Sequence, residues 1–472
     1  MADSTTTNLL LTKPEVGAST DTWGTKSNTN WDSVDSLFAA DGTGTSVGLN
    51  VGSGKKLKIV GDVIDTNGNE LLKVTATASA VNELTLANAA TGGAPTLTAS
   101  GGDTNIGMKL VGKGTGEVTA RVNGSDVFNA SSNFGFKNRI INGAMVIDQR
   151  NAGASVTPTA SAYTLDRWEA GLSVTSKFSV QRSTTAPTGF TNSLLATSTS
   201  AYTVGAGEIF VLTQFIEGYN VADMGFGTAS AATFTFSFWV RSSLTGTFGG
   251  SLQNSSRARS YPFTYTINAA NTFEQKTITV VGDTTGTWLT DNGRGLNVIF
   301  SLGAGATFSG TANAWATANY YSATGATSVV GTSGATFYIT GVQLEKGSTA
   351  TSFDYRPYGT ELALCQRYYA KMQASDAFGM LGIGSVGSAT AVSIYAKLPV
   401  SMRSQPTINY STLRLDDNTA NPAVTSLGTN RSGVDNVSQT FNASGGGLTA
   451  NRVGMLQANN STSGYLDATA EL

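Results

Sequence analysis

The residues best suited to chemistry in this sequence are aromatic side chains beside planar polar groups. Trp239 and Arg241 alternate with Phe234, Phe236 and Phe238, so the two sets face opposite sides of an extended strand. Because the phenylalanine row favours a core, we expect Trp239 and Arg241 on the outer face. An indole ring can stack on a sugar, and a guanidinium can bind its hydroxyls. The pair predicts saccharide binding; the equal alternative is that Trp239 packs beneath a surface loop.

A second aromatic group stands in a stretch rich in glycine, alanine, serine and threonine. It holds Trp315, Tyr320 and Tyr321, with Asn319 beside them. Aromatic residues in such loops are candidates for stacking on sugars, although each could instead anchor the loop to the domain beneath it. The ligand-binding residues predicted from the sequence are Trp239, Arg241, Trp315, Tyr320 and Tyr321.

Further aromatic and basic residues admit two interpretations. Arg257, Arg259, Tyr261 and Tyr265 could line one strand face and meet acidic sugars, or they could form a solvated face. Trp168, which follows an Asp-Arg pair, is expected in the core.

The composition excludes several classes of site. The chain has 472 residues, no histidine and one cysteine, Cys365, so it cannot form an imidazole-based triad, a His-ligated zinc site or an intrachain disulfide. Its net charge of -2 gives no long-range attraction for nucleic acid or acidic membranes. No apolar run approaches the ~18 residues of a membrane span, and the N-terminus lacks a signal-peptide pattern. We expect no cofactor, metal, nucleic-acid partner or membrane insertion.

The elements that must position these residues are strands. The 55 glycines, together with small, β-branched and aromatic residues, indicate an all-β chain with many tight turns. Four segments are predicted. They are an attachment segment at 1–45, a shaft at 46–132, a jelly-roll β-sandwich at 133–357 and a small β domain at 358–472.

The residue pattern of the attachment segment predicts a short amphipathic helix. Asn30 fits its N-cap, and the apolar residues after it fall on one face. A segment this small cannot bury apolar side chains alone, so they pack against copies of the chain or dock on a partner. The predicted attachment residues are Trp23, Trp31, Val34, Leu37 and Phe38.

The shaft segment carries short alternating strands with a turn signal about every ten residues. Each strand has too few apolar residues to build a core within one chain. Intertwining three copies supplies both a core and partners for the strand edges, so we expect a homotrimeric fibre. A flexible Gly/Ser linker is the alternative.

The last segment opens with a predicted helix that carries Leu362, Cys365, Tyr369 and Met372 at helical spacing, with Cys365 as a core side chain. Strands are expected to follow. Aromatic residues there offer an alternative recognition surface, namely Tyr395, Tyr410 and Tyr465. The predicted strands are Ala391–Val400, Thr407–Leu415 and Val453–Ala458.

Several of these segments resemble bacteriophage tail fibres. Leu11 to Trp23, with Trp31 to Phe38, is similar to their virion-attachment start. Lys113-Gly114-Thr115-Gly116-Glu117-Val118 resembles a repeat of their shafts. Asn138-Arg139-Ile140-Ile141-Asn142-Gly143-Ala144-Met145 is similar to the opening of a phage-associated, carbohydrate-binding-like jelly roll. That module closes with Ile339-Thr340-Gly341-Val342-Gln343-Leu344-Glu345 and with Tyr355-Arg356-Pro357-Tyr358.

The resemblance implies a structural virion protein that is assembled in the host cytoplasm. Its N-terminus would attach to the phage tail, baseplate or an adaptor protein, and its C-terminal half would recognise a host cell-surface glycan. We expect no enzymatic activity. Two alternatives stay open, namely a tailspike-like depolymerase that uses paired carboxylates and a purely architectural fibre or collar protein.

Overall fold

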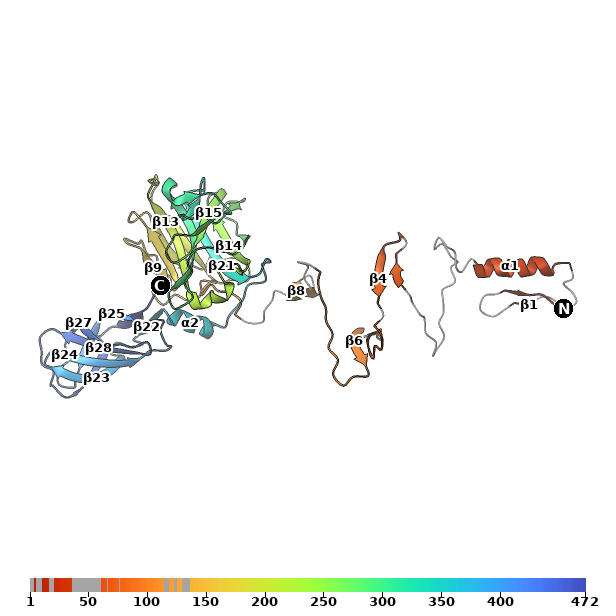
Figure 1. Cartoon of the computed structure of the whole chain (residues 1–472). Coiled ribbons are helices and arrows are strands. Elements are labelled where there is room, and N and C mark those ends of the chain that lie inside the picture. The colour runs from red at the N-terminus through yellow and green to blue at the C-terminus, as the bar shows by residue number, and fades with distance from the viewer. Residues whose placement is uncertain are drawn as a thin grey trace. The chain divides into compact units, whose positions relative to one another are not determined.

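The computed structural model describes residues 4–5, 11–16, 21–35, 61–65, 67–75, 77–113, 119–122, 125–129 and 136–472. The chain divides into two compact units, residues 1–111 and residues 112–472. Strands make up most of the regular structure in both (Figure 1), so the predicted all-β class is confirmed. Among the described ranges, no helix is long and apolar enough to cross a membrane.

The N-terminal unit opens with two short strands and a helix. β1 (Ser4–Thr5) pairs with β2 (Thr12–Lys13), and α1 spans Trp23–Asp35. The prediction that Asn30 caps the helix is wrong, because α1 begins earlier. The Asn30 side chain instead accepts a hydrogen bond from the Thr12 backbone N–H at 2.8 Å and donates one to the Thr12 carbonyl at 2.6 Å. This amide ties the helix to β2, a tertiary role that capping preferences do not reveal.

The attachment residues predicted from the sequence lie partly on this helix. Trp23 is 61% exposed and Trp31 is 69% exposed, while Val34 is half-buried. Leu37 and Phe38 lie outside the described residues. Two exposed indole rings on so short a helix are the kind of apolar surface that a partner covers, and the attachment role stays a prediction.

Isolated two-stranded hairpins follow. Several of their leucines face solvent, including Leu84 and Leu86. A lone hairpin is marginally stable in water, so these pairs need further strands to be stable. The pairs are β3 (Gly61–Ile64) with β4 (Glu70–Val74), β5 (Asn82–Ala87) with β6 (Thr96–Gly101), and β7 (Thr119–Val122) with β8 (Ser125–Asn129).

Two antiparallel sheets then pack face to face as a sandwich and share one core. The five-stranded sheet has the order β11 (Phe178–Ser183), β12 (Ser193–Ser198), β21 (Thr336–Lys346), β14 (Phe234–Ser242) and β17 (Glu274–Val280). The six-stranded sheet has the order β16 (Ser260–Ile267), β15 (Gly246–Gln253), β18 (Arg294–Ala304), β13 (Ile209–Glu217), β10 (Trp168–Leu172) and β9 (Ala162–Leu165).

The core of the sandwich is aromatic. Phe234, Phe236 and Phe238 are fully buried on β14, as their alternation predicts, and Trp168 is fully buried as well. Phe300, from the opposite sheet, has its ring centroid 5.6 Å from that of Phe236 and 4.9 Å from that of Phe238. Tilted and edge-to-face ring pairs of this kind add about 0.5–1.5 kcal/mol each beyond the burial of their area. The predicted core positions are therefore confirmed.

A long connection between β18 and β21 covers part of the outer face of the six-stranded sheet. It contains the short parallel strands β19 (Ser309–Gly310) and β20 (Ser322–Ala323). Within it, Tyr321 packs against Val211 of β13 and Ile299 of β18. The outer face of this sheet is therefore walled by a loop and is not a flat solvent surface.

The C-terminal domain opens with α2 (Tyr358–Gln366) and holds two sheets. A three-stranded sheet has the order β22 (Tyr369–Gln373), β30 (Tyr465–Thr469) and β25 (Thr407–Ser411). A six-stranded sheet has the order β26 (Leu413–Asp416), β29 (Val453–Ala458), β23 (Met380–Ser388), β24 (Ala391–Lys397), β28 (Asn436–Ala443) and β27 (Val424–Asn430).

Two expectations for this domain need correction. The helix ends at Gln366, so Tyr369 and Met372 lie on β22, where pairing with β30 satisfies their backbone. The single strand expected at Thr407–Leu415 is two strands in different sheets, because the chain turns at Thr412, whose φ is 53°. Cys365 is fully buried, as predicted.

Ion pairs to buried carboxylates join the C-terminal domain to the sandwich. Arg367 donates two hydrogen bonds to the buried carboxylate of Glu217 on β13, at 2.5 and 2.9 Å. The hydroxyl of Tyr368 donates a third at 2.6 Å. A second pair joins Arg167, at the β9–β10 turn, to Glu471. These contacts fix the two domains of this unit as one body.

Candidate functional site

A groove lies on the outer face of the six-stranded sheet, across the neighbouring strands β15, β18, β13 and β10. Its hollow measures about 100 Å³, which is small for an enclosed ligand site, so a ligand would lie along the groove with one edge in the hollow. The lining residues are Ser161, Glu169, Gly171, Ile209, Val211, Thr213, Phe215, Gln253, Arg257, Asn297, Ile299 and Tyr321.

Two amide side chains with unused oxygens stand side by side in this lining. Gln253 and Asn297 are directly paired across β15 and β18, and both are 0% exposed. The Gln253 amide nitrogen donates to the Tyr320 carbonyl at 2.8 Å, and that of Asn297 donates to the Asn254 carbonyl at 3.3 Å. Neither side-chain oxygen has a hydrogen-bond partner in the described part of the chain. A buried acceptor left unpaired costs about 1–3 kcal/mol, so a hydroxyl donor that reached either oxygen would be stabilised there.

Charged groups flank these amides. Glu169 lies half-buried on β10, and this burial raises the pKa of its carboxyl group, while Arg294 and Arg257 act in the opposite direction. Arg257 is exposed, and its guanidinium carbon lies 5.7 Å from the ring centroid of Tyr321. The groove thus combines amide, carboxylate and guanidinium groups with an apolar lining from Val211 and Ile299. This set can bind hydroxyl groups and the apolar face of a sugar ring.

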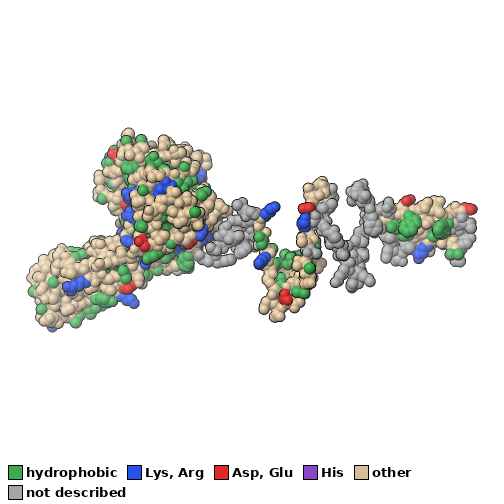
Figure 2. All heavy atoms as spheres, in the orientation of Figure 1, with side chains coloured by type: hydrophobic (Ala, Val, Ile, Leu, Met, Phe, Trp, Pro, Cys, Tyr) green, Lys and Arg blue, Asp and Glu red, His purple; other side chains and the backbone are tan. Residues whose placement is uncertain are grey.

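Charged side chains are otherwise sparse. On the face of the molecule shown in Figure 2, lysines, arginines and acidic residues are scattered among uncharged ones. Recognition in the groove would therefore depend on short-range hydrogen bonds and ring contacts and would change little with salt.

The loop aromatics predicted from the sequence have three different positions. Tyr321 lines the groove but is buried, so it forms part of the wall, and its ligand-binding role stays a prediction. Tyr320 is half-buried and covers Gly310, where a Cβ would lie 2.3 Å from its ring. Trp315 anchors the loop, because its indole N–H donates to the Val281 carbonyl at 2.8 Å.

Trp239 and Arg241 lie on the outer face of the other sheet, as their alternation predicts. Both are half-buried. Trp239 and the ring of Phe190 close around Gly341, whose Cβ would meet both rings. The guanidinium carbon of Arg241 lies 4.9 Å from the ring centroid of Tyr338. The structure therefore does not bring this pair to the groove.

The four residues expected on one strand face, two arginines and two tyrosines, also lie in different places. Arg257 reaches the groove, whereas Arg259 forms an ion pair with Asp283 at 2.6 Å. Tyr261 and Tyr265 face the core. The residues that the sequence did not reveal are Glu169, Gln253 and Asn297; alternation places them outward, but no local signal shows that a distant loop encloses them.

The described residues hold no cluster of three or more His, Cys, Asp or Glu side chains that could bind a metal ion. Glu169 is the one carboxylate among the residues that line the groove. The groove is therefore equipped to hold a ligand by hydrogen bonds, and its lining offers one acidic group for proton transfer.

No protein-family model and no curated protein matches the chain. Among solved structures, the enzymatically active domain of tailspike protein 4 of bacteriophage CBA120 matches 45% of this chain but 22% of its own length, at 12% identity and a TM-score of 0.24. The family 11 carbohydrate-binding module of Clostridium thermocellum, solved with a β-1,3-1,4-mixed-linked tetrasaccharide, matches 43% of this chain and 100% of its own, at 9% identity and a TM-score of 0.22. Likenesses of this size assign no function, so the function is argued from the residues of this chain.

Proposed function

We propose that the sandwich binds carbohydrate in the groove and does not cleave it. The observation that carries this proposal is the pair of buried amides, Gln253 and Asn297, whose side-chain oxygens have no partner among the described residues. Sugar hydroxyls are donors of the kind these acceptors bind, and Glu169 and Arg257 offer further polar contacts. Glycoside hydrolysis ordinarily needs two carboxyl groups, and the groove lining supplies one.

We propose that the whole chain is a bacteriophage tail fibre. Residues 1–45 attach it to the phage tail, baseplate or an adaptor protein, and the C-terminal half recognises a host cell-surface glycan. The fibre is assembled in the host cytoplasm and acts in the virion tail. Three grooves on one trimer would convert weak sugar binding into useful avidity. The resemblance to fibre sequences and the exposed tryptophans of α1 support this proposal.

Incubation with bacterial surface polysaccharides separates binding from cleavage. The full chain is expected to be retained saturably on at least one immobilised polysaccharide and to leave the chain length of the same polymer in solution unchanged. Size-exclusion chromatography of the polymer before and after incubation checks the second point. Shortened chains would replace the binding proposal with the depolymerase alternative.

We expect the chain to form a homotrimer, and the leucines exposed on the hairpins support association. Leu86 on β5 is 81% exposed in the single chain, and neighbouring strands β4 and β6 also expose leucines. Burial of one such side chain contributes roughly 1.5–3 kcal/mol, so association is expected to cover them. Native mass spectrometry is expected to give three times the mass of the chain. A monomer at micromolar concentration would contradict the proposed shaft.

Binding in the groove is expected to depend on pH through Glu169. Because burial raises its pKa above the ordinary 4.5, Glu169 takes up a proton at a higher pH than an exposed glutamate does. The neutral acid is a weaker acceptor, so affinity for a neutral polysaccharide should fall several-fold as the pH drops through this raised pKa. The chain has no histidine, so no imidazole titrates alongside Glu169. The Glu169→Gln variant should not show this fall in affinity with pH. If the variant shows the same fall, another titrating group causes it.

A further inference from the structure

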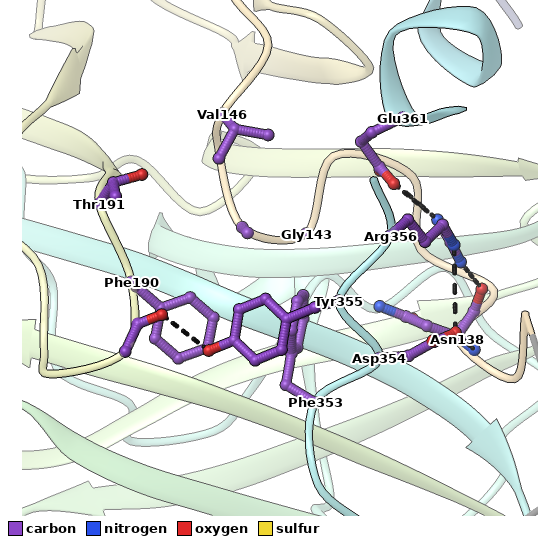
Figure 3. Close-up of a pocket in the computed structure, with 12 residues that line it drawn as sticks. Asn138, Gly143, Val146, Phe190, Thr191, Phe353, Asp354, Tyr355, Arg356 and Glu361 are labelled. Carbon is purple, nitrogen blue, oxygen red and sulfur yellow. Dashed lines mark hydrogen bonds and ion pairs between the residues drawn. The ribbon is translucent and has the colours of Figure 1, made fainter. Parts of the chain in front are cut away.

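A second hollow in the sandwich shares no lining residue with the groove and measures about 270 Å³. Four segments form it: the stretch before β9, the β11–β12 connection, the extended chain between β21 and α2, and α2 itself through Glu361 (Figure 3). Its volume lies just below the range of small-molecule pockets, so it has room for a single monosaccharide unit or a group of that size.

Three aromatic rings form one side of this pocket. The ring centroids of Phe353 and Tyr355 are 4.9 Å apart, those of Phe190 and Phe353 are 5.1 Å apart, and those of Phe190 and Tyr355 are 5.5 Å apart. These are contact distances, so no group can enter between the rings, and a cation cage is excluded. The rings instead form a continuous apolar surface, and Figure 3 shows Gly143 and Val146 on the opposite side of the hollow.

Backbone geometry holds this surface in place. Gly189 has a φ of 92° at the third position of a turn that the Phe190 N–H closes onto the Pro187 carbonyl at 3.0 Å. A residue with positive φ at this position is typical of a type II turn and favours glycine. The Tyr355 hydroxyl donates to the Gly189 carbonyl at 2.8 Å, although the residue is 58% exposed. The ring surface is therefore fixed while it remains open to a ligand.

The polar end of the pocket offers one unused acceptor. Arg356 donates to the Ile140 carbonyl at 3.1 Å and pairs with Glu361 at 3.2 Å, so both charged groups are engaged within the fold. Asp354 uses its Oδ2 atom to accept the Asn138 backbone N–H at 3.3 Å. Oδ2 also lies 4.0 Å from Arg356 Nε, and the Asp354 side chain is partly exposed. Among residues 136–472, the hydrogen bond that the Asp354 carboxylate accepts goes to Oδ2, which leaves Oδ1 as the free acceptor.

We propose that this pocket binds the acetamido group of an N-acetylated amino sugar. An acetamido group carries an N–H donor, a carbonyl acceptor and a methyl group. Its N–H and its methyl group match the acceptor at Asp354 beside an apolar surface. The methyl group would be buried against the rings and Val146. A sugar face with several hydroxyls fits less well, because most of the polar groups in the lining are already used. The inference rests on the proposed carbohydrate binding and names the sugar class for this second site.

Saturation-transfer NMR with the full chain tests the proposal, with N-acetylglucosamine, glucosamine and glucose as probes. The acetamido methyl protons are expected to receive the strongest saturation, and the two probes without the group should bind at least tenfold more weakly. Equal binding of the three probes, or no saturation of the methyl protons, would overturn the proposal.

Three variants locate the site. Tyr355→Ala removes part of the ring surface. Thr191→Trp blocks the opening and removes only an exposed hydrogen bond to Asn192. Each variant should weaken binding of N-acetylglucosamine at least tenfold. Tyr358→Ala, an exposed neighbour that does not line the pocket, is the matched control and should bind normally. Unchanged binding in Thr191→Trp would contradict the assignment even if Tyr355→Ala fails to fold. Asn297→Leu alters the groove and should leave binding of N-acetylglucosamine intact. The proposal for the pocket can therefore fail independently of the proposal for the groove.

Discussion

Replacement of Arg167 by methionine is expected to lower the free energy of unfolding by about 3 kcal/mol. Arg167 is 1% exposed and forms an ion pair with Glu471, which is 7% exposed. Its guanidinium carbon also lies 3.6 Å from the ring centroid of Tyr368, and it donates to the Phe215 carbonyl. Removal of one partner of a buried pair leaves a buried charge and costs about 3–5 kcal/mol. Arg150 still pairs with Glu471 at 2.7 Å. Because the Glu471 charge keeps this partner, we expect a loss at the lower end of that range.

Chemical denaturation followed by tryptophan fluorescence measures this loss. The control is Arg139→Met, which breaks a much more exposed pair with Asp223 and is expected to change stability by less than about 1 kcal/mol. The double variant with Glu471→Gln should be less unstable than the sum of the single variants, because the pair is then removed as a unit. Equal effects of Arg167→Met and Arg139→Met would show that the ion pair does not hold the two domains together.

Asn297→Leu is expected to weaken binding of a recognised polysaccharide about tenfold or more. Leucine has nearly the same shape as asparagine but removes the unpaired oxygen, together with the 3.3 Å hydrogen bond to the Asn254 carbonyl. The lost hydrogen bond to the ligand, about 1.5 kcal/mol, appears in the affinity. Asn297 suits this test better than Gln253, whose amide also holds the loop at Tyr320.

Isothermal titration calorimetry of the full chain measures the change. Ser301→Ala is the matched control, because Ser301 is buried on the same face of β18 but does not line the groove. If Asn297→Leu binds with wild-type affinity and has a normal melting temperature, the groove is not the binding site. Equal losses in both variants would indicate a general disturbance of the strand.

Local patterns predict the local structure of this chain well. The alternation of Phe234, Phe236 and Phe238 identifies the core face of β14, because side chains in a strand alternate strictly between two faces. Patterns that span a chain reversal are less informative. The predicted strand at Thr407–Leu415 satisfies the alternation on both sides of Thr412, yet a positive φ there sends the two halves to different sheets.

The candidate site depends on contacts between distant residues, which explains why its key members were not predicted. Tyr321 belongs to a loop of the kind that commonly exposes aromatic rings, but that loop folds back over Val211 and Ile299. Gln253 and Asn297 are ordinary polar strand residues until the sheet pairs them beneath the same loop. The pairing of Arg167 with Glu471, far apart in the sequence, has no local signal either.

We propose that this chain recognises a glycan on a bacterial surface through its sandwich. The most direct test is binding of the fluorescently labelled full chain to a panel of bacterial strains, before and after mild periodate oxidation of the cells and, in parallel, after protease treatment. We expect saturable binding to at least one strain that periodate abolishes, that protease leaves intact and that Asn297→Leu weakens. Binding that survives periodate and is lost after protease would identify a protein receptor and contradict the claim.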